Sequence, residues 1–71
     1  MKYLVMDIRK TDLFVNEFNN KVEAFKYAKD DFEHMHKLDQ KNCRQYYVLE
    51  SINPDEDSEN HYDGNIILSL K

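Results

Sequence analysis

The chain has 71 residues, of which 41% are hydrophobic and 34% are charged, and its formal net charge is −4. This length supports a single domain, residues 1–71, and the interspersed apolar residues exclude a disordered chain. The single glycine excludes a glycine-rich phosphate-binding loop, and the single cysteine, Cys43, excludes an internal disulfide.

No stretch of the sequence approaches the ~20 apolar residues that span a bilayer. The apolar run at the start of the chain breaks at Asp7, which is too early for a secretory signal. We therefore expect a cytoplasmic protein with a free thiol and no membrane partner.

The first predicted element is a strand over residues 2–9, KYLVMDIR. Leu4, Met6 and Ile8 share one face of it, because side chains alternate with a period of two in a half-buried strand. We expect this apolar face to contribute to the core.

A second strand is predicted over residues 13–18, LFVNEF, after a polar break at residues 10–12. It would pair with the first strand as a hairpin. The spacing of Phe14 and Phe18 also fits a helix, but the residues between them are middling helix formers, which favours the strand.

A helix is predicted over residues 21–37. Asn20 lies three residues before Glu23, which is the spacing of an N-cap residue and its capping-box partner. Apolar residues then recur every three or four positions and form the stripe of an amphipathic helix. The stripe consists of Val22, Phe25, Ala28, Phe32 and Met35. Residues 38–44 should form a second short helical turn or a structured connector.

Two more strands are predicted, over residues 45–52, QYYVLESI, and residues 64–70, GNIILSL. Between them, Pro54 begins a break and the Asp63-Gly64 pair ends it. The element order is ββαββ, and a strand order of 2-1-3-4 would make every neighbouring pair antiparallel. We predict an α+β fold in two layers, a four-stranded antiparallel sheet with one main helix packed on one face.

The periodicity of each element also predicts the core between the helix and the sheet. The residues expected to be buried there are Leu4, Met6, Ile8, Phe25, Phe32, Val48, Ile66 and Leu68.

Residues 47–65, YVLESINPDEDSENHYDGN, resemble the C-terminal half of a group of short uncharacterised proteins from Gram-positive bacteria and their phages and mobile elements. Members of this group pair a KYLV-like first strand with a helix, a YVLES strand and an NPDED…NHxDG segment. The resemblance implies a compact bacterial or phage-type cytosolic protein. It transfers no functional residue to this sequence.

Residues 53–65 contain five carboxylates, one histidine and no lysine or arginine. Three of the acids alternate as the ligands of a calcium loop do. An EF-hand counted from Asp55 would need glycine and an acid where Asn60 and Ile66 stand, so the pattern fails.

Two other interpretations of this segment stay open. His61 with Asp57 or Asp63 could ligate a transition metal, because imidazole and carboxylate groups suit such ions. The segment could also be a solvated hairpin loop without a ligand.

The remaining histidines do not form a metal site. His34 and His36 lie about 200° apart around a helix, so they cannot bind one ion from one helical face. Asp30 and His34 are four residues apart and can share a face.

Cys43 is the one candidate nucleophile. Lys41 and Arg44 near it in the sequence would lower the pKa of the thiol. No histidine stands in an evident partner position, and no catalytic motif occurs in the chain. We therefore predict that the protein is not an enzyme and uses no cofactor.

The acidic residues are concentrated in one segment. Residues 50–63 hold six of the fourteen acids and no base, whereas the remainder has eight acids and ten bases. Such a segment repels nucleic acid and attracts a basic protein surface. We predict a small cytosolic protein-binding module, a phage-type or mobile-element inhibitor or regulator that occupies a basic surface of a host protein. The alternative is a metal-ion or small-molecule binding protein that uses residues 53–65 with His61.

The expected partner is a protein with a basic surface, without direct contact to nucleic acid. An exposed edge strand also allows a weak homodimer. The predicted partner-binding residues are Glu50, Asp55, Glu56, Asp57, Glu59, Tyr62 and Asp63.

Overall fold

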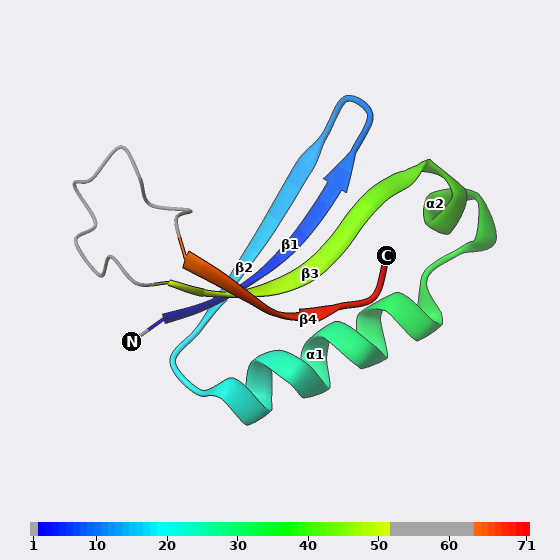
Figure 1. The fold of residues 1–71 in the computed structure, drawn as a ribbon. Coiled ribbons are helices and arrows are strands. Elements are labelled where there is room, and N and C mark those ends of the chain that lie inside the picture. Colours follow the sequence, from blue (N-terminus) through cyan, green and yellow to red (C-terminus); the bar gives the residue numbers. More distant parts are fainter. Residues whose placement is uncertain (1, 52–63) are drawn as a thin grey trace.

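The computed structural model describes residues 2–51 and 64–71, which form a four-stranded sheet with the long helix on one face (Figure 1). The strands are β1 (Lys2–Arg9), β2 (Leu13–Phe18), β3 (Cys43–Ser51) and β4 (Gly64–Ser69), and the helices are α1 (Lys21–His34) and α2 (Lys37–Asn42). The strand order is β2-β1-β3-β4, and every neighbouring pair is antiparallel. The predicted α+β fold, element order and strand order are confirmed.

The helix α1 begins at Asn20, as predicted. The side-chain oxygen of Asn20 accepts hydrogen bonds from the backbone N–H groups of Val22 at 2.8 Å and Glu23 at 3.3 Å. These bonds satisfy two amides that the first helical turn leaves free. Val22 itself is 72% exposed, whereas Ala24 and Ala28 are fully buried. Val22 is wrongly placed in the predicted stripe, because two residues correspond to about 200° around a helix and Val22 lies opposite Ala24.

The C-terminal end of α1 lies at His34 rather than at residue 37, because Met35 adopts an extended backbone with a ψ angle of 137°. Gln40 of α2 compensates for the lost helical hydrogen bonds. Its side-chain nitrogen donates to the carbonyl oxygens of Phe32 at 2.9 Å and Met35 at 3.3 Å. The short helix therefore caps the long one.

The main core lies between α1 and the sheet. Its buried residues are Val5, Ala24, Ala28, Cys43, Tyr46 and Val48. The two alanines let the helix backbone lie close to the strands. At the edge of the core the ring of Phe32 packs edge-on against the ring of Tyr46, with 5.2 Å between ring centroids.

The predicted core is wrong about which face of β1 the helix covers. Leu4 and Met6 are buried, with exposed fractions of 1% and 3%, but they pack with Leu49 in a second cluster. The core residue that β1 supplies beneath α1 is Val5. Alternation separates two faces of a strand without showing which one receives a helix, and each face of β1 carries apolar residues.

The predicted burial of Ile66 is also wrong, because 60% of this residue is exposed. The β3–β4 register shifts between Val48 and Leu49, so that Val48 pairs with Leu68 and Leu49 pairs with Ile66. The extra residue, Ile67, forms a bulge that breaks the alternation. Leu68 therefore packs with the core beneath α1. Ile66 pairs with Leu49, which belongs to the cluster on the opposite face.

Substituting Phe32 by Ala is expected to lower the free energy of unfolding by about 3 kcal/mol. This is the lower end of the range for a large aromatic core residue, because Phe32 is half-buried against Tyr46. Urea unfolding followed by circular dichroism measures the change. The control Ile66→Ala removes an exposed side chain and should alter stability by about 0.5 kcal/mol or less. Equal losses in the two variants would contradict the assigned core.

Candidate functional site

Of the seven predicted partner-binding residues, the structure describes Glu50. This residue is half-buried in β3, where it pairs with Tyr3 of β1 and Asn65 of β4. The other six, which lie outside the described residues, are Asp55, Glu56, Asp57, Glu59, Tyr62 and Asp63. The alternative metal ligand His61 also lies outside them.

The ends of the acidic segment, residues 52–63, are held by the β3–β4 pairing. Ser51 pairs with Gly64, and Glu50 pairs with Asn65. The strands approach so closely that a Cβ atom on Gly64 would lie 2.9 Å from the carbonyl carbon of Glu50 and closer still to its oxygen. Glycine is therefore required at the point where the chain re-enters the sheet.

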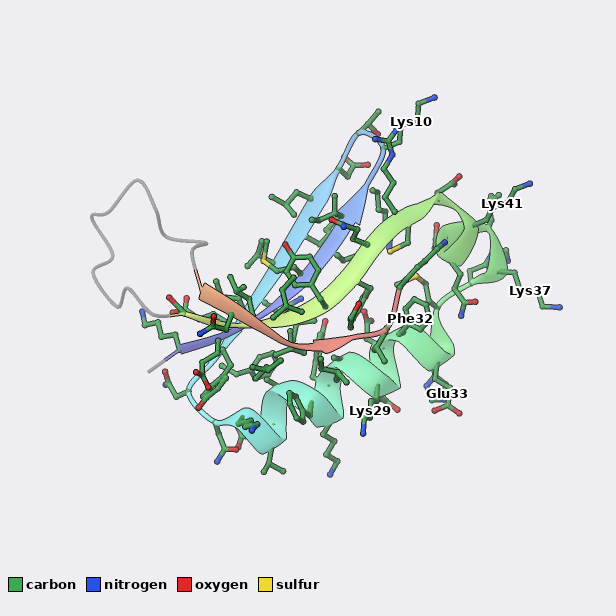
Figure 2. All side chains as sticks on the ribbon, viewed as in Figure 1. Lys10, Lys29, Phe32, Glu33, Lys37 and Lys41 are labelled. Atoms are coloured by element: carbon green, nitrogen blue, oxygen red, sulfur yellow. The ribbon has the colours of Figure 1, made fainter. Side chains whose placement is uncertain are left out.

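Positive charge is prominent at the other end of the molecule. Lys10 follows β1, and Lys37 and Lys41 belong to α2 (Figure 2). All three are exposed, and they lie far from the end of the sheet where β3 stops and β4 begins.

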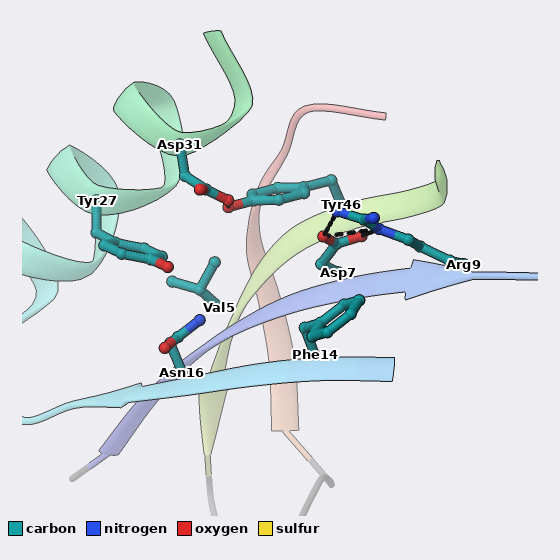
Figure 3. A pocket seen from close by; sticks show the side chains of 8 residues that line it. All are labelled: Val5, Asp7, Arg9, Phe14, Asn16, Tyr27, Asp31 and Tyr46. Carbon is teal, nitrogen blue, oxygen red and sulfur yellow. Dashed lines mark hydrogen bonds and ion pairs between the residues drawn. The ribbon is translucent and has the colours of Figure 1, made fainter. Parts of the chain in front are cut away.

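A polar cavity of about 190 Å³ lies between α1 and the sheet (Figure 3). Its apolar lining consists of Val5 and Phe14. Its polar lining comes from β1, β2, α1 and β3, and consists of Asp7, Arg9, Asn16, Tyr27, Asp31 and Tyr46.

The carboxylate of Asp7 is buried at one side of this cavity, with an exposed fraction of 6%. Arg9 donates to it from Nη2 at 3.0 Å and from Nε at 3.3 Å, and the Cys43 thiol donates to it at 3.3 Å. The Arg9 guanidinium also lies 4.8 Å from the centroid of the Phe14 ring and 3.5 Å from an oxygen of Asp39. The charge of Asp7 is thus compensated inside the protein.

Asp31 occupies another part of the lining, on α1. The hydroxyl group of Tyr46 donates to its Oδ2 atom at 2.7 Å. The pKa of Tyr46 is raised far above its usual range, first by burial and then by this hydrogen bond. The pKa of Tyr27 is also raised, by burial and by the negative charge of Asp31 and Asp7. Both phenols therefore stay neutral at physiological pH.

The expectation that Lys41 and Arg44 lower the pKa of the Cys43 thiol is wrong. The pKa of its thiol is raised, mainly by burial and then by the hydrogen bond to Asp7. Lys71 and Arg9 oppose this shift without reversing it. A buried thiol beside a carboxylate is a poor nucleophile, because the reactive thiolate is disfavoured.

Asp30 and His34 share a face of α1, as predicted, with 3.3 Å between His34 Nδ1 and an Asp30 carboxylate oxygen. Both side chains are exposed. Within residues 2–51 and 64–71, no group of three histidine, cysteine or acidic residues could hold a metal ion. No helix in the described part of the chain is long and apolar enough to cross a membrane.

The cavity residues Asp7 and Asp31 are absent from the predicted site, although the sequence carries a signal for each. Asp7 is the only charged residue between Tyr3 and Ile8 in the first strand. Asp31 follows Ala24 and Ala28 at the helical spacing of the buried face, where an apolar residue is expected. A carboxylate at an apolar position indicates a buried polar interaction.

Comparison with known proteins gives no match for this chain among family models, curated proteins or solved structures.

Substituting Gly64 by Ala is expected to destabilise the β3–β4 pair by about 1–3 kcal/mol, because the new methyl group would overlap the Glu50 carbonyl. Hydrogen exchange of the backbone amides in β3 and β4 measures the loss locally, and urea unfolding measures it globally. Asn65→Ala is the matched control, because that side chain is exposed. Unchanged protection in Gly64→Ala would show that the pair accommodates the methyl group and would contradict the requirement for glycine.

Stability should fall as the pH rises above about 9. The pKa values of Cys43 and Tyr46 are raised in the folded protein from ordinary values of 9.0 and 10.0. Below those values both states keep the protons and the stabilisation is complete. Above them the unfolded chain releases protons that the folded chain retains, so the free energy of unfolding decreases.

Urea unfolding from about pH 7 to about pH 10.5 measures this decrease. Tyr46→Phe should flatten the alkaline part of the curve, because the phenol is removed. A free energy of unfolding that stays constant to about pH 10.5 would contradict the burial of these groups.

Proposed function

We propose that the chain is a small protein-binding module that occupies a basic surface of a partner protein. The observation that carries this proposal is the antiparallel pairing of Ser51, at the end of β3, with Gly64, at the start of β4. It holds both ends of a segment, residues 52–63, that contains five acids and no base. The acids are thereby attached to one end of the sheet.

The distribution of charge supports a basic partner. The described residues contain ten bases and nine acids, so they are nearly neutral. The net charge of −4 therefore originates in residues 52–63. A local field of one sign raises the encounter rate with an oppositely charged surface and repels nucleic acid.

Apolar exposure supports a protein partner. Ile66 lies two residues after Gly64 and is 60% exposed, on the sheet face opposite α1. Protein interfaces combine an apolar centre with a charged rim, and Ile66 offers exposed apolar surface close to Gly64, where the chain re-enters the sheet after residues 52–63.

Occupation of a basic surface has a regulatory consequence. A basic groove that binds a polyanion cannot hold that ligand and an acidic module at the same time. We therefore propose that the module is an inhibitor or regulator of its partner, in line with the resemblance to short proteins of bacteria and mobile elements.

Neutralising Asp55, Glu56, Asp57 and Glu59 with the amides Asn or Gln should slow association with the partner. The partner is obtained by affinity capture and purified, and stopped-flow measurements give the association rate at low and at physiological salt. At low salt the rate should fall by roughly tenfold or more, and the difference should shrink as salt screens the field.

The matched control neutralises four exposed acids elsewhere, Asp12, Glu23, Asp30 and Glu33. It changes the net charge by the same amount and should slow association much less, because its charges are not gathered in one segment. Equal rates for the two variants would contradict the proposal. Loss of a stoichiometric divalent ion from the first variant would support the metal-binding alternative instead.

A further inference from the structure

The polar cavity between α1 and the sheet offers a second candidate site, and its lining shares no residue with the acidic segment. We propose that it binds one organic cation, an alkylammonium or guanidinium group. The cation could belong to a small molecule or to a basic side chain of another protein. The inference uses described residues only and does not depend on the proposed function.

The charge of the lining favours a cation. Asp7 and Arg9 neutralise each other, because two nitrogen atoms of the Arg9 guanidinium donate hydrogen bonds to the Asp7 carboxylate. The same guanidinium also forms an ion pair with Asp39. Asp31 receives the Tyr46 hydroxyl on Oδ2, and its Oδ1 has no hydrogen-bond partner among the described residues. One carboxylate oxygen of Asp31 therefore remains available to a ligand in this half-open cavity, and its negative charge favours a cation.

An anion would find no comparable partner. The only basic group in the lining is Arg9, and its guanidinium already contacts two carboxylates. The hydroxyl groups of Tyr27 and Tyr46 stay protonated, so neither tyrosine adds charge to the cavity.

The neutral groups of the lining complete a site for a cation. Figure 3 shows the side chains of Asp31, Tyr27 and Asn16 around Val5, with the hydroxyl of Tyr27 and the amide of Asn16 near it. Neither Tyr27 nor Asn16 has a side-chain hydrogen bond to another described residue. The hydroxyl oxygen of Tyr27 and Oδ1 of Asp31 can accept hydrogen bonds that an ammonium or guanidinium group donates.

Aromatic rings border the same space. Phe14 is 47% exposed and Tyr27 is 36% exposed, so each presents part of its ring to an incoming group. The Arg9 guanidinium, 4.8 Å from the Phe14 centroid, shows that this ring already engages a cation of the proposed kind. Cation–π attraction would add to the hydrogen bonds of a second cation.

The size of the cavity limits the ligand. Its volume of about 190 Å³ is on the order of six water molecules. Sites for drug-sized ligands begin at roughly 300 Å³. The end of one arginine or lysine side chain fits this volume.

The test is a titration of ¹⁵N-labelled protein with N-acetyl-arginine amide and with n-butylammonium, followed by amide chemical shifts. Saturable shifts are expected at residues 16, 27 and 31, with a dissociation constant of about 1–10 mM. N-acetyl-citrulline amide is the neutral control with nearly the same shape and should produce no saturable shift at these positions.

Asp31→Asn retains an acceptor for the Tyr46 hydroxyl and removes the charge, so the affinity for the cations should fall by roughly tenfold or more. Asp30→Asn makes the same charge change on the exposed face of α1 and should leave the affinity unchanged. Tyr27→Phe keeps the ring, removes one acceptor and should weaken binding severalfold. It provides a second test if Asp31→Asn does not fold.

Shifts of equal size with the citrulline compound, or equal affinity in Asp31→Asn and Asp30→Asn, would overturn the inference. The tripeptide Gly-Arg-Gly distinguishes the source of the cation. Tighter binding of the tripeptide indicates a side chain of another protein, and equal binding indicates a free small cation. The variant with four neutral residues at positions 55, 56, 57 and 59 should bind N-acetyl-arginine amide normally, so this result is independent of the proposed function.

Discussion

Tyr46 is the residue through which the layers of this small fold are joined. Its ring is fully buried and packs against Phe32 of α1, while its hydroxyl bonds to Asp31. Its backbone also exchanges hydrogen bonds with Leu70 and Lys71 at the end of the chain. A single position in β3 thus orients the helix and the C-terminus together. A domain of this length has few alternative contacts with which to do so.

The burial of Tyr46 has an electrostatic consequence. Its hydroxyl needs an acceptor beneath α1, and Asp31 supplies one at the cost of a charge in the helix–sheet interface. Nearby, Asp7 requires Arg9 and Cys43 for the same reason. The polar cavity lies between these two carboxylates. Its polar lining therefore results from the hydrogen bonds and the ion pair that the buried groups of the core require.

Much of the architecture can be predicted from local pattern. The alternation over residues 2–9 and 13–18, the Asn20 cap and the strands on either side of the acidic segment all correspond to elements of the structure. The strand order could be predicted because short connections favour antiparallel neighbours. The end of α1 was placed three residues too late, because the capping of Phe32 and Met35 by Gln40 is a contact between elements.

The cavity was not predicted, for a related reason. Asp7 and Asp31 lie 24 positions apart in the chain, and nothing local indicates that they line one space. For Asp7, which stands between Met6 and Ile8, the anomaly of a carboxylate at an apolar position was visible in the sequence, whereas for Asp31 it depends on the burial of Ala24. Its meaning was not visible, because the partners Arg9, Cys43 and Tyr46 come together only when β1, β3 and α1 pack.

The sequence by itself determined the element types, their order and the segregation of acidic charge into residues 52–63, because these depend on composition and short-range periodicity. Tertiary structure decided which face of β1 receives the helix, and it placed Ile66 on the face opposite Leu68 through the bulge at Ile67. It also buried Cys43 and so raised the pKa of its thiol. Strand alternation is symmetric between two faces, and burial depends on neighbours distant in the chain, so only packing could decide these features.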